Sequence, residues 1–248
     1  ANLRHPHVVT VFEADELDGV LYLAFEYIDG PDLGTILARD GALEPARAVG
    51  IVAQVADALD AAHAARLVHR DVKPANILLG HRGEDHAYLA DLGLTWTADA
   101  ASDAGLTMAG QFVGTPGYVA PEQIEGAGEV DHRADVYALG CVLYAALTGS
   151  IPHQRDSTLA ILWAHVWEPP PLLSATRPGL EPFDAVVTRA LAKAPADRFQ
   201  TAGALAQAAT GALSALDPGT VGDAGVVILA AASAASSAFG HTFIDPVR

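Results

Sequence analysis

The chain has 248 residues, of which 51% are hydrophobic, enough to bury the core of one globular domain. Its formal net charge of -16 argues against a general role on nucleic acid or on an anionic membrane, because both attract clustered Lys and Arg. The single cysteine, Cys141, cannot form an internal disulfide, and its apolar surroundings predict a small buried side chain rather than a reactive thiol.

Two short apolar runs near the start of the chain predict β-strands. Residues 8–12 and 20–25 are rich in β-branched and aromatic side chains, and the stretch 15–19 between them is typical of a turn. We therefore expect a β-hairpin here. From residue 44 to residue 66 apolar side chains recur at helical spacing, with Pro45 in the first turn, which predicts one long and mostly buried helix.

The rest of the chain changes from short strands to helices. Residues 77–79 and 88–90 are apolar, too short for helices, and bounded by polar, glycine-bearing loops, so we expect two small strands. Beyond residue 121, proline-rich breaks separate four stretches with a helical pattern. These predicted helices cover residues 133–148, 157–166, 183–193 and 201–216. The predicted fold class is α+β, with most of the domain helical.

The most informative segment is residues 69–76, which read His-Arg-Asp-Val-Lys-Pro-Ala-Asn. Phosphoryl transfer needs a carboxylate to accept a hydroxyl proton, a cation beside the moving phosphate and an amide oxygen for magnesium, and this short segment offers all three. The segment fits the pattern H-R-D-x-x-x-x-N, so the chain resembles the protein kinases, and in style the bacterial eukaryotic-like (Hanks-type) Ser/Thr kinases. The resemblance assigns the three tasks to Asp71, Lys73 and Asn76, and it implies Ser or Thr acceptors on protein substrates.

A second motif follows at the family's spacing. Asp91-Leu92-Gly93 resembles the D-F-G element, whose aspartate chelates magnesium. The resemblance therefore makes Asn76 and Asp91 the metal ligands, with ATP and Mg²⁺ (or Mn²⁺) as the implied cofactors. Leucine stands where the family has phenylalanine, and because that residue packs rather than reacts, we expect Asp91 to keep its role.

Residues 114–122 read Gly-Thr-Pro-Gly-Tyr-Val-Ala-Pro-Glu and look like the family's substrate-docking loop, which ends in the A-P-E signature. The resemblance implies that Thr115 contacts Asp71 and Lys73. These contacts belong to the Ser/Thr-type members of the family. The loop is therefore expected to lie beside the catalytic segment.

Three further residues are implied structural supports. The resemblance pairs Glu122 with Arg198, which stands in the segment Ala-Asp-Arg-Phe at residues 196–199. It also makes Asp135, at the start of a buried helix, the residue that holds the backbone of the catalytic loop. Each motif alone is short, but their common order and spacing make a chance match improbable.

The same resemblance places a nucleotide next to the predicted hairpin. Phe25 would guard the back of the adenine pocket. The implied nucleotide contacts are the Glu26 carbonyl and the Ile28 amide at adenine, Asp32 near the ribose, and Leu78 beneath the adenine. An ordinary core position explains Leu78 equally well, and Asp32 fits a helix cap as readily as a ribose contact.

The resemblance implies a protein kinase-like fold in which a mostly helical C-lobe carries a remnant β-hairpin and the hinge of an N-lobe. We expect a partial kinase domain at residues 1–213, with the end of the N-lobe and the hinge in 1–29 and the C-lobe in 30–213. An Ala- and Ser-rich tail with its linker would fill 214–248. The sequence contains neither the family's glycine-rich phosphate lid nor its strand lysine. The chain is thus expected to be cut at its front and nearly inactive alone.

Regulation by phosphorylation is also implied. Arg70, directly before the catalytic aspartate, has no place in proton transfer, and in the family it pairs with a phosphate on the activation loop. The candidate acceptors in this loop are Thr95, Thr97, Ser102 and Thr107. We favour Thr107 because of its distance before Gly114 and Thr115.

A non-catalytic alternative remains open. A kinase-like scaffold could bind partners through residues 157–167, although the intact catalytic residues argue against it. Self-phosphorylation and a kinase dimer are possible further partnerships. Residues 224–240 are uncharged, but they are short and rich in Ala and Ser for a membrane span, so we expect a cytoplasmic protein.

Overall fold

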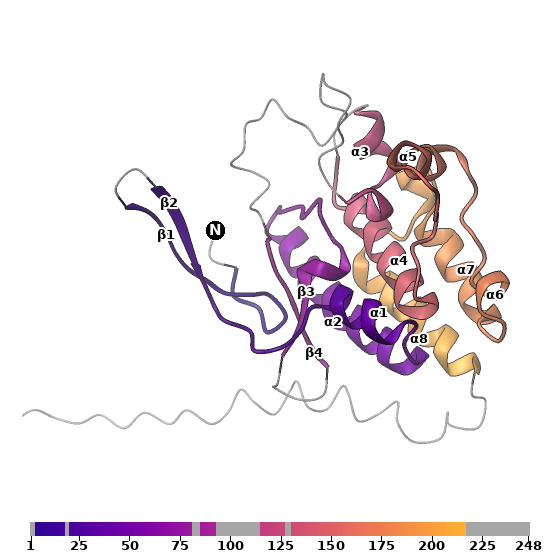
Figure 1. Cartoon of the computed structure of the whole chain (residues 1–248), viewed down its shortest axis with the longest axis horizontal. Coiled ribbons are helices and arrows are strands. Elements are labelled where there is room, and N and C mark those ends of the chain that lie inside the picture. The colour runs from indigo at the N-terminus through magenta and orange to yellow at the C-terminus, as the bar shows by residue number, and fades with distance from the viewer. Residues whose placement is uncertain (1–2, 18–19, 81–84, 93–114, 127–129, 217–248) are drawn as a thin grey trace, which may run out of the picture.

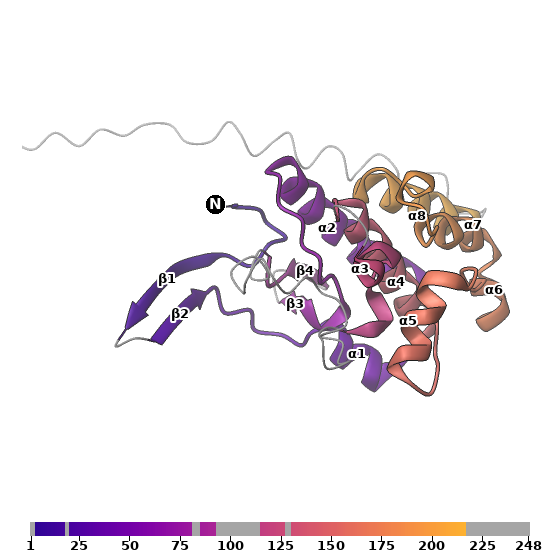
Figure 2. The same cartoon turned by 90° about the horizontal axis from the view of Figure 1, so that it is seen from above.

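The computed structural model describes residues 3–17, 20–80, 85–92, 115–126 and 130–216. Helices form a body on one side of the molecule, and a β-hairpin extends from its other side (Figures 1 and 2). A second two-stranded sheet lies between them, and both sheets are antiparallel. The predicted α+β class is confirmed.

The hairpin consists of β1 (Val11–Leu17) and β2 (Val20–Phe25). Their register pairs Val11 with Phe25 and Leu17 with Val20, and it shifts between Val11 and Glu13. The predicted turn at residues 15–19 is wrong for 15–17, which pair across the ribbon. Because β1 is exposed along its whole length, acidic side chains can occupy this strand although their composition is typical of turns.

The start of the predicted first strand is also wrong. Val8 and Val9 are buried, and they run along the second sheet rather than in the hairpin. The Val9 amide donates to the Leu89 carbonyl over 3.0 Å, and the Leu89 amide donates to the His7 carbonyl over 2.8 Å. An apolar run alone does not show whether its residues pair within the hairpin or along the second sheet.

The core is built around helix α4 (Arg133–Thr148), whose residues from 134 to 147 are all buried. Such a helix, apolar on every face, belongs at the centre of a helical body. Helix α2 (Pro45–Ala64) packs against α4, α8 (Ala202–Leu216) and β4. Helix α7 (Glu181–Ala190) packs between α4 and α8. These four helices confirm the four longest helical predictions with bounds shifted by three residues at most.

Cys141 on α4 is fully buried, and burial raises the pKa of its thiol, as expected for a packing residue.

The remaining elements are short, and three of the helices among them, α1, α3 and α6, were not predicted. The other helices and strands are α1 (Leu33–Asp40), β3 (Ile77–Gly80), β4 (His86–Leu89), α3 (Pro121–Glu125), α5 (Thr158–Trp167) and α6 (Leu173–Thr176).

Helix α8 ends at Leu216, and the tail at residues 217–248 lies outside the described part of the chain. The predicted domain limits therefore stay predictions. None of the helices within the described ranges is long and apolar enough to cross a membrane.

Two buried histidines lie at α5. His165 belongs to α5, His153 precedes it, and their ring centroids are 5.1 Å apart. His165 Nδ1 meets the Tyr137 hydroxyl at 2.8 Å, but the Nε2 atoms of both histidines lack a hydrogen-bond partner in the described structure. Burial lowers the pKa of His153 to about 4 and that of His165 to about 3.

This pair predicts acid sensitivity. An unfolded histidine takes up its proton near pH 6.5, so stability is retained above that pH and lost as the pH falls towards the folded pKa values. His153→Phe removes one of the two titrations and should lessen the loss of stability between pH 7.5 and pH 5 by about 2 kcal/mol. Denaturant unfolding at both pH values measures this. Stability curves that stay parallel for the two proteins would contradict the prediction.

Candidate active site

The predicted catalytic loop follows α2 and is fixed by one buried carboxylate. Asp135, at the start of α4, accepts the amides of His69 over 2.8 Å and Arg70 over 2.7 Å. His63 Nε2 lies 2.7 Å from the same carboxylate. Because a buried carboxylate must find donors, these contacts explain how Asp135 is tolerated in an apolar helix. They also agree with the support role predicted for Asp135.

The three predicted catalytic side chains lie together. Lys73 Nζ donates to Asp71 Oδ2 over 2.6 Å. Asn76 Nδ2 donates to the same oxygen over 3.1 Å and to the Asp71 carbonyl over 2.8 Å. Proline at the first position of a short 3₁₀ turn, Pro74–Asn76, bends the chain so that Asn76 returns to Asp71. The Asp71 side chain remains 34% exposed and is therefore open to a substrate hydroxyl.

The residues predicted to hold magnesium fit that metal. The Asn76 amide nitrogen is used by Asp71, which leaves Oδ1 as an oxygen ligand, and the Asp91 carboxylate is exposed. The Ala90 amide donates to the Asn76 carbonyl over 2.8 Å, so Asp91 follows directly after a contact with Asn76. Oxygen ligands of this kind suit Mg²⁺. Asp91 also has a φ of 61°, which is uncommon for a residue other than glycine and typical of functional positions.

The neighbours of Asp91 support its position. Leu92 is partly buried and packs against the core, which agrees with a packing role for the middle residue of the motif. His69 Nε2 contacts the Ala90 carbonyl at 2.9 Å. Gly93 lies outside the described residues, so the motif is seen only in its first two members.

The predicted docking loop reaches the described part of the chain at Thr115. Thr115 is exposed, and in the described structure it makes no hydrogen bond to Asp71 or Lys73, so its predicted contacts stay a prediction. Tyr118 is partly buried beside the core, and burial raises the pKa of its hydroxyl.

The end of the docking loop is anchored by an ion pair. Arg198 NH1 and NH2 donate to the two carboxylate oxygens of Glu122 over 2.6 and 2.7 Å. Arg198 is fully buried, and its guanidinium lies 4.8 Å from the centre of the Tyr137 ring. This is the pairing that the sequence predicted for Glu122 and Arg198.

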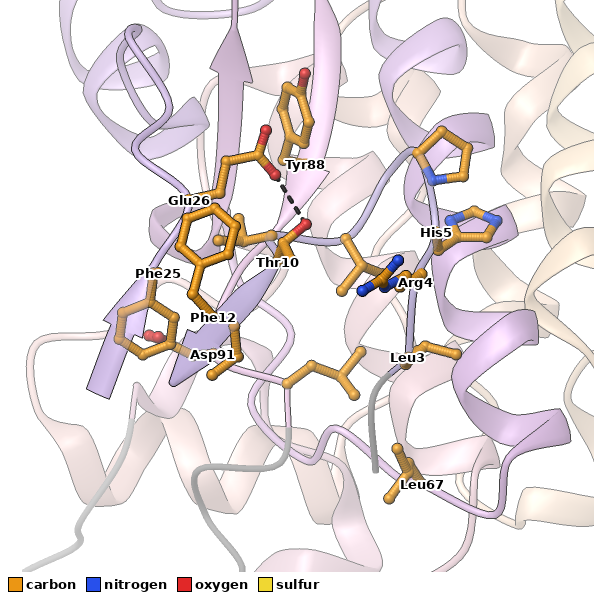
Figure 3. Close-up of a pocket in the computed structure, with 15 residues that line it drawn as sticks. Leu3, Arg4, His5, Thr10, Phe12, Phe25, Glu26, Leu67, Tyr88 and Asp91 are labelled. Carbon is orange, nitrogen blue, oxygen red and sulfur yellow. Dashed lines mark hydrogen bonds between the residues drawn. The ribbon is translucent and has the colours of Figure 1, made fainter. Parts of the chain in front are cut away.

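A cavity of about 680 Å³ lies between the hairpin and the helical body. Figure 3 shows Phe12 and Phe25 grouped with Asp91 on one side of it, and Leu3, Arg4 and His5 on the other. Glu26 also lines the cavity, and its carboxylate accepts the Thr10 hydroxyl over 2.9 Å. The cavity thus joins the residue predicted to guard the adenine pocket with the predicted metal ligand Asp91.

Three predicted nucleotide contacts do not line this cavity, namely Ile28, Asp32 and Leu78. The chain after β2 meets β3 instead, where Asp32 forms a bridge to Leu78 and the Leu79 amide donates to the Pro31 carbonyl over 2.9 Å. Leu78 is partly buried. Asp32 caps α1, because its two carboxylate oxygens accept the Thr35 amide over 2.9 Å and the Thr35 hydroxyl over 2.6 Å. The cap interpretation is confirmed, and the ribose contact stays a prediction.

Ile28 lies close to β3 as well. A Cβ placed on Gly80 would come within 3.0 Å of Ile28 Cγ2, so the segment from 26 to 32 passes directly over this strand. Gly30 approaches the strand even more closely, since a Cβ there would lie 1.8 Å from the Leu79 carbonyl oxygen. This close approach of Gly30 is not evident from the sequence, because Asp-Gly-Pro signals a turn without showing what the turn contacts.

Of the predicted regulatory residues, the structure describes Arg70 but not Thr107. The Arg70 side chain is exposed and has no carboxylate partner among the described residues, and its backbone has a φ of 65°. Thr107 and the other candidate acceptors lie outside the described residues. Sequence reasoning missed two residues that support the catalytic loop. Gln123 binds the Arg70 carbonyl directly, whereas His63 binds Asp135, which in turn holds the loop.

The chain is similar to known proteins in sequence. The sequence model described as "Protein kinase domain" matches residues 1–207. The serine/threonine-protein kinases PknH and PknE of Mycobacterium tuberculosis (strain ATCC 25618 / H37Rv) are both 48% identical to the chain, over 86% and 87% of it. The chain spans about a third of their length, 33% and 37% respectively.

Solved structures agree. The crystal structure of the M. tuberculosis PknI kinase domain has a TM-score of 0.66 to this chain at 36% identity, covering 86% of this chain and 74% of that one. A PknI double mutant has the same TM-score at 35% identity, covering 86% and 73%. The chain therefore belongs to the protein kinase family, and its relatives include the Hanks-type serine/threonine kinases of mycobacteria.

Proposed function

We propose that the chain carries the catalytic loop of a Ser/Thr protein kinase, which transfers the γ-phosphate of ATP to Ser or Thr hydroxyls of proteins. The observation that carries the proposal is the Asp71 carboxylate, one oxygen of which accepts hydrogen bonds from both Lys73 and Asn76. Asp135 fixes the backbone of the same loop. A carboxylate that is oriented yet partly exposed is suited to accept a proton from an incoming hydroxyl.

Each residue of the cluster has one task. Asp71 accepts the hydroxyl proton, and Lys73 places a positive charge where negative charge develops on the transferring group. Asn76 Oδ1 and the Asp91 carboxylate would hold magnesium. Bound magnesium supplies positive charge that offsets the charge of the phosphate oxygens.

Nucleotide selection is assigned to the segment that passes over β3. We propose that the Glu26 carbonyl and the Ile28 amide bind the adenine edge and that Leu78 packs beneath the ring. Each Asp32 oxygen accepts one bond from Thr35 in the helix cap, and a carboxylate oxygen can accept a second bond, so a ribose hydroxyl could donate to Asp32 without breaking the cap. The cap alone already explains the position of Asp32, which makes it the weakest of these four assignments.

We also propose that this chain transfers phosphate poorly by itself. Large apolar side chains of the hairpin are uncovered, among them Phe12 at 68%, Val20 at 65% and Leu21 at 80% exposure. An uncovered apolar ribbon of this kind calls for a further segment to pack on it. In the protein kinase family that segment carries the phosphate lid and the strand lysine.

Control by phosphorylation fits the exposed Arg70. Its guanidinium has no carboxylate partner within the described ranges, and a guanidinium can pair with a phosphate group in two parallel hydrogen bonds. We propose that a phosphate on Thr107, added by a second copy of the protein or by another kinase, binds Arg70 and so connects this loop to the catalytic segment. Mass spectrometry of the active protein tests this, and an unmodified loop in that protein would rule it out.

A phosphate-transfer assay tests the main proposal. The full-length gene product, with any residues encoded before Ala1, and the 248-residue chain are each incubated with ATP, Mg²⁺ and a basic protein substrate. Transfer to Ser or Thr by the complete protein, with little by the chain and none after chelation of Mg²⁺, is the expected result. A complete protein without transfer would refute the proposed phosphate-transfer activity.

The scaffold alternative has one observation in its favour. Leu159, Trp163 and Trp167 recur at four-residue spacing on α5 and are 59%, 57% and 67% exposed. Exposed tryptophans grouped on one helix face are typical of protein interfaces. If the upstream sequence lacks the phosphate lid and no transfer occurs, partner binding through α5 becomes the better proposal.

A further inference from the structure

Gln123 connects two functional loops through a single buried side chain. It lies in the first turn of α3 and is 6% exposed. Its Oε1 accepts the Ala120 amide over 3.1 Å, and its Nε2 donates to the Arg70 carbonyl over 2.9 Å. One end of the amide therefore binds the docking loop, and the other end binds the residue before Asp71.

The Arg70 carbonyl belongs to a residue whose backbone conformation depends on its contacts. Arg70 has a φ of 65°, an uncommon backbone conformation that persists only where surrounding contacts impose it. Asp135 binds the amide of Arg70 on one side. Gln123 binds its carbonyl, which belongs to the peptide bond that leads into Asp71. The backbone that aims Asp71 is thus held at both ends.

Helix α3, which carries Gln123, is itself anchored to the helical body. Glu122, the neighbour of Gln123, is bound by the fully buried Arg198, so α3 is anchored to the helical body. Ala120 is the last residue of the docking loop before α3, and its amide is satisfied by Gln123. The positions of the docking loop and of Asp71 are therefore set by the same anchored side chain.

We propose that Gln123 is a positioning residue, which aligns the docking loop with the catalytic carboxylate of Asp71. This role rests on the proposed function, because it concerns the reaction at Asp71. If the role of Gln123 were purely structural, it would support the fold without affecting kcat, the rate at which bound substrate is phosphorylated. The two roles differ in what a change of its amide does to kcat.

The test uses Gln123→Glu and Gln123→Met in the complete protein. A glutamate keeps an oxygen for the Ala120 amide but loses the N–H that binds the Arg70 carbonyl, whereas methionine loses both bonds. We expect kcat for a Ser/Thr peptide to fall by about 10- to 100-fold in Gln123→Glu, with a small change in KM, because the aim of Asp71 is lost. Gln123→Met should raise KM as well.

Gln54 provides a matched control. Its amide also bridges two backbone groups, accepting the Ala87 amide over 2.9 Å and donating to the Asp85 carbonyl over 3.0 Å, but at the β3–β4 connection. Gln54→Glu should lower the unfolding temperature about as much as Gln123→Glu does, while kcat stays at the wild-type value. An equal loss of kcat in Gln54→Glu and Gln123→Glu would overturn the positioning role.

Two readouts separate this proposal from the kinase proposal itself. Amide hydrogen exchange in the 248-residue chain needs no activity, and Gln123→Glu should speed exchange at His69 and Arg70 whereas Gln54→Glu should not. In the active protein, burial raises the pKa of the new carboxyl, so Gln123→Glu regains a donor and part of its kcat as the pH falls. Unchanged exchange, or an unchanged kcat, would overturn the proposal.

Discussion

Asp71→Asn in the complete protein is expected to reduce phosphate transfer by about 10²- to 10⁴-fold, the usual contribution of a positioned general base. The substitution keeps the shape of the side chain and an oxygen for Lys73, which is 2.6 Å from Oδ2 in the wild-type protein. It removes the basic carboxylate that accepts the hydroxyl proton. The rate of peptide phosphorylation at saturating ATP measures the loss.

The fold should be unaffected by this change. Asp71 is partly exposed, and the contacts that fix its loop are made by backbone groups to Asp135. Asp57→Asn is a suitable control, because that carboxylate is 66% exposed and its ion-pair partner, His5 at 3.3 Å, lies outside the catalytic loop. Both variants should unfold as the wild type does. Turnover retained by Asp71→Asn would refute its assignment as the base.

The long helices could be predicted from the sequence because their apolar patterns extend over many residues. The predicted limits of α4 agree with the structure at both ends, and those of α8 differ by one residue at its start. Short elements lack such a pattern. Helix α1 depends on the Asp32 cap and on two buried residues, Leu33 and Ile36, which is tertiary information.

The first strand shows a different limit. Val8 to Phe12 is one apolar run in the sequence, yet its first part follows β4 and its last part enters β1. Nothing within five consecutive residues shows that their partners differ. Residues 15–19 have the composition of a turn, yet 15–17 pair within the hairpin, because strand composition is a weaker signal on a ribbon that is exposed to water.

For the candidate site, the motifs predicted the reacting side chains but only part of what holds them. Asp71, Lys73 and Asn76 are neighbours in sequence, so a short pattern suffices to find them. Gln123 contacts a carbonyl 53 positions away, and His63 contacts a carboxylate 72 positions away. Such partners belong to no local pattern, and only the folded chain shows them.

The largest effect on stability is expected from Arg198→Met. Arg198 is fully buried and binds both oxygens of Glu122, which is itself 14% exposed. Three backbone carbonyls also accept from its guanidinium, those of Ala192, Lys193 and Arg133. The variant leaves a mostly buried carboxylate and these carbonyls without their donor. Loss of one partner of a buried pair costs about 3–5 kcal/mol, measured here by denaturant unfolding at pH 7.

A double variant distinguishes this explanation from a simple loss of packing. Arg198→Met with Glu122→Leu removes both charges, so it should be more stable than Arg198→Met alone, although three carbonyls remain unpaired. The exposed pair of Arg155 and Glu168 is the control, and Arg155→Met should cost about 0–1 kcal/mol. If Arg198→Met destabilised no more than Arg155→Met, the ion pair would not anchor α3. The support proposed for Gln123, and through it for Asp71, would then have to come from elsewhere.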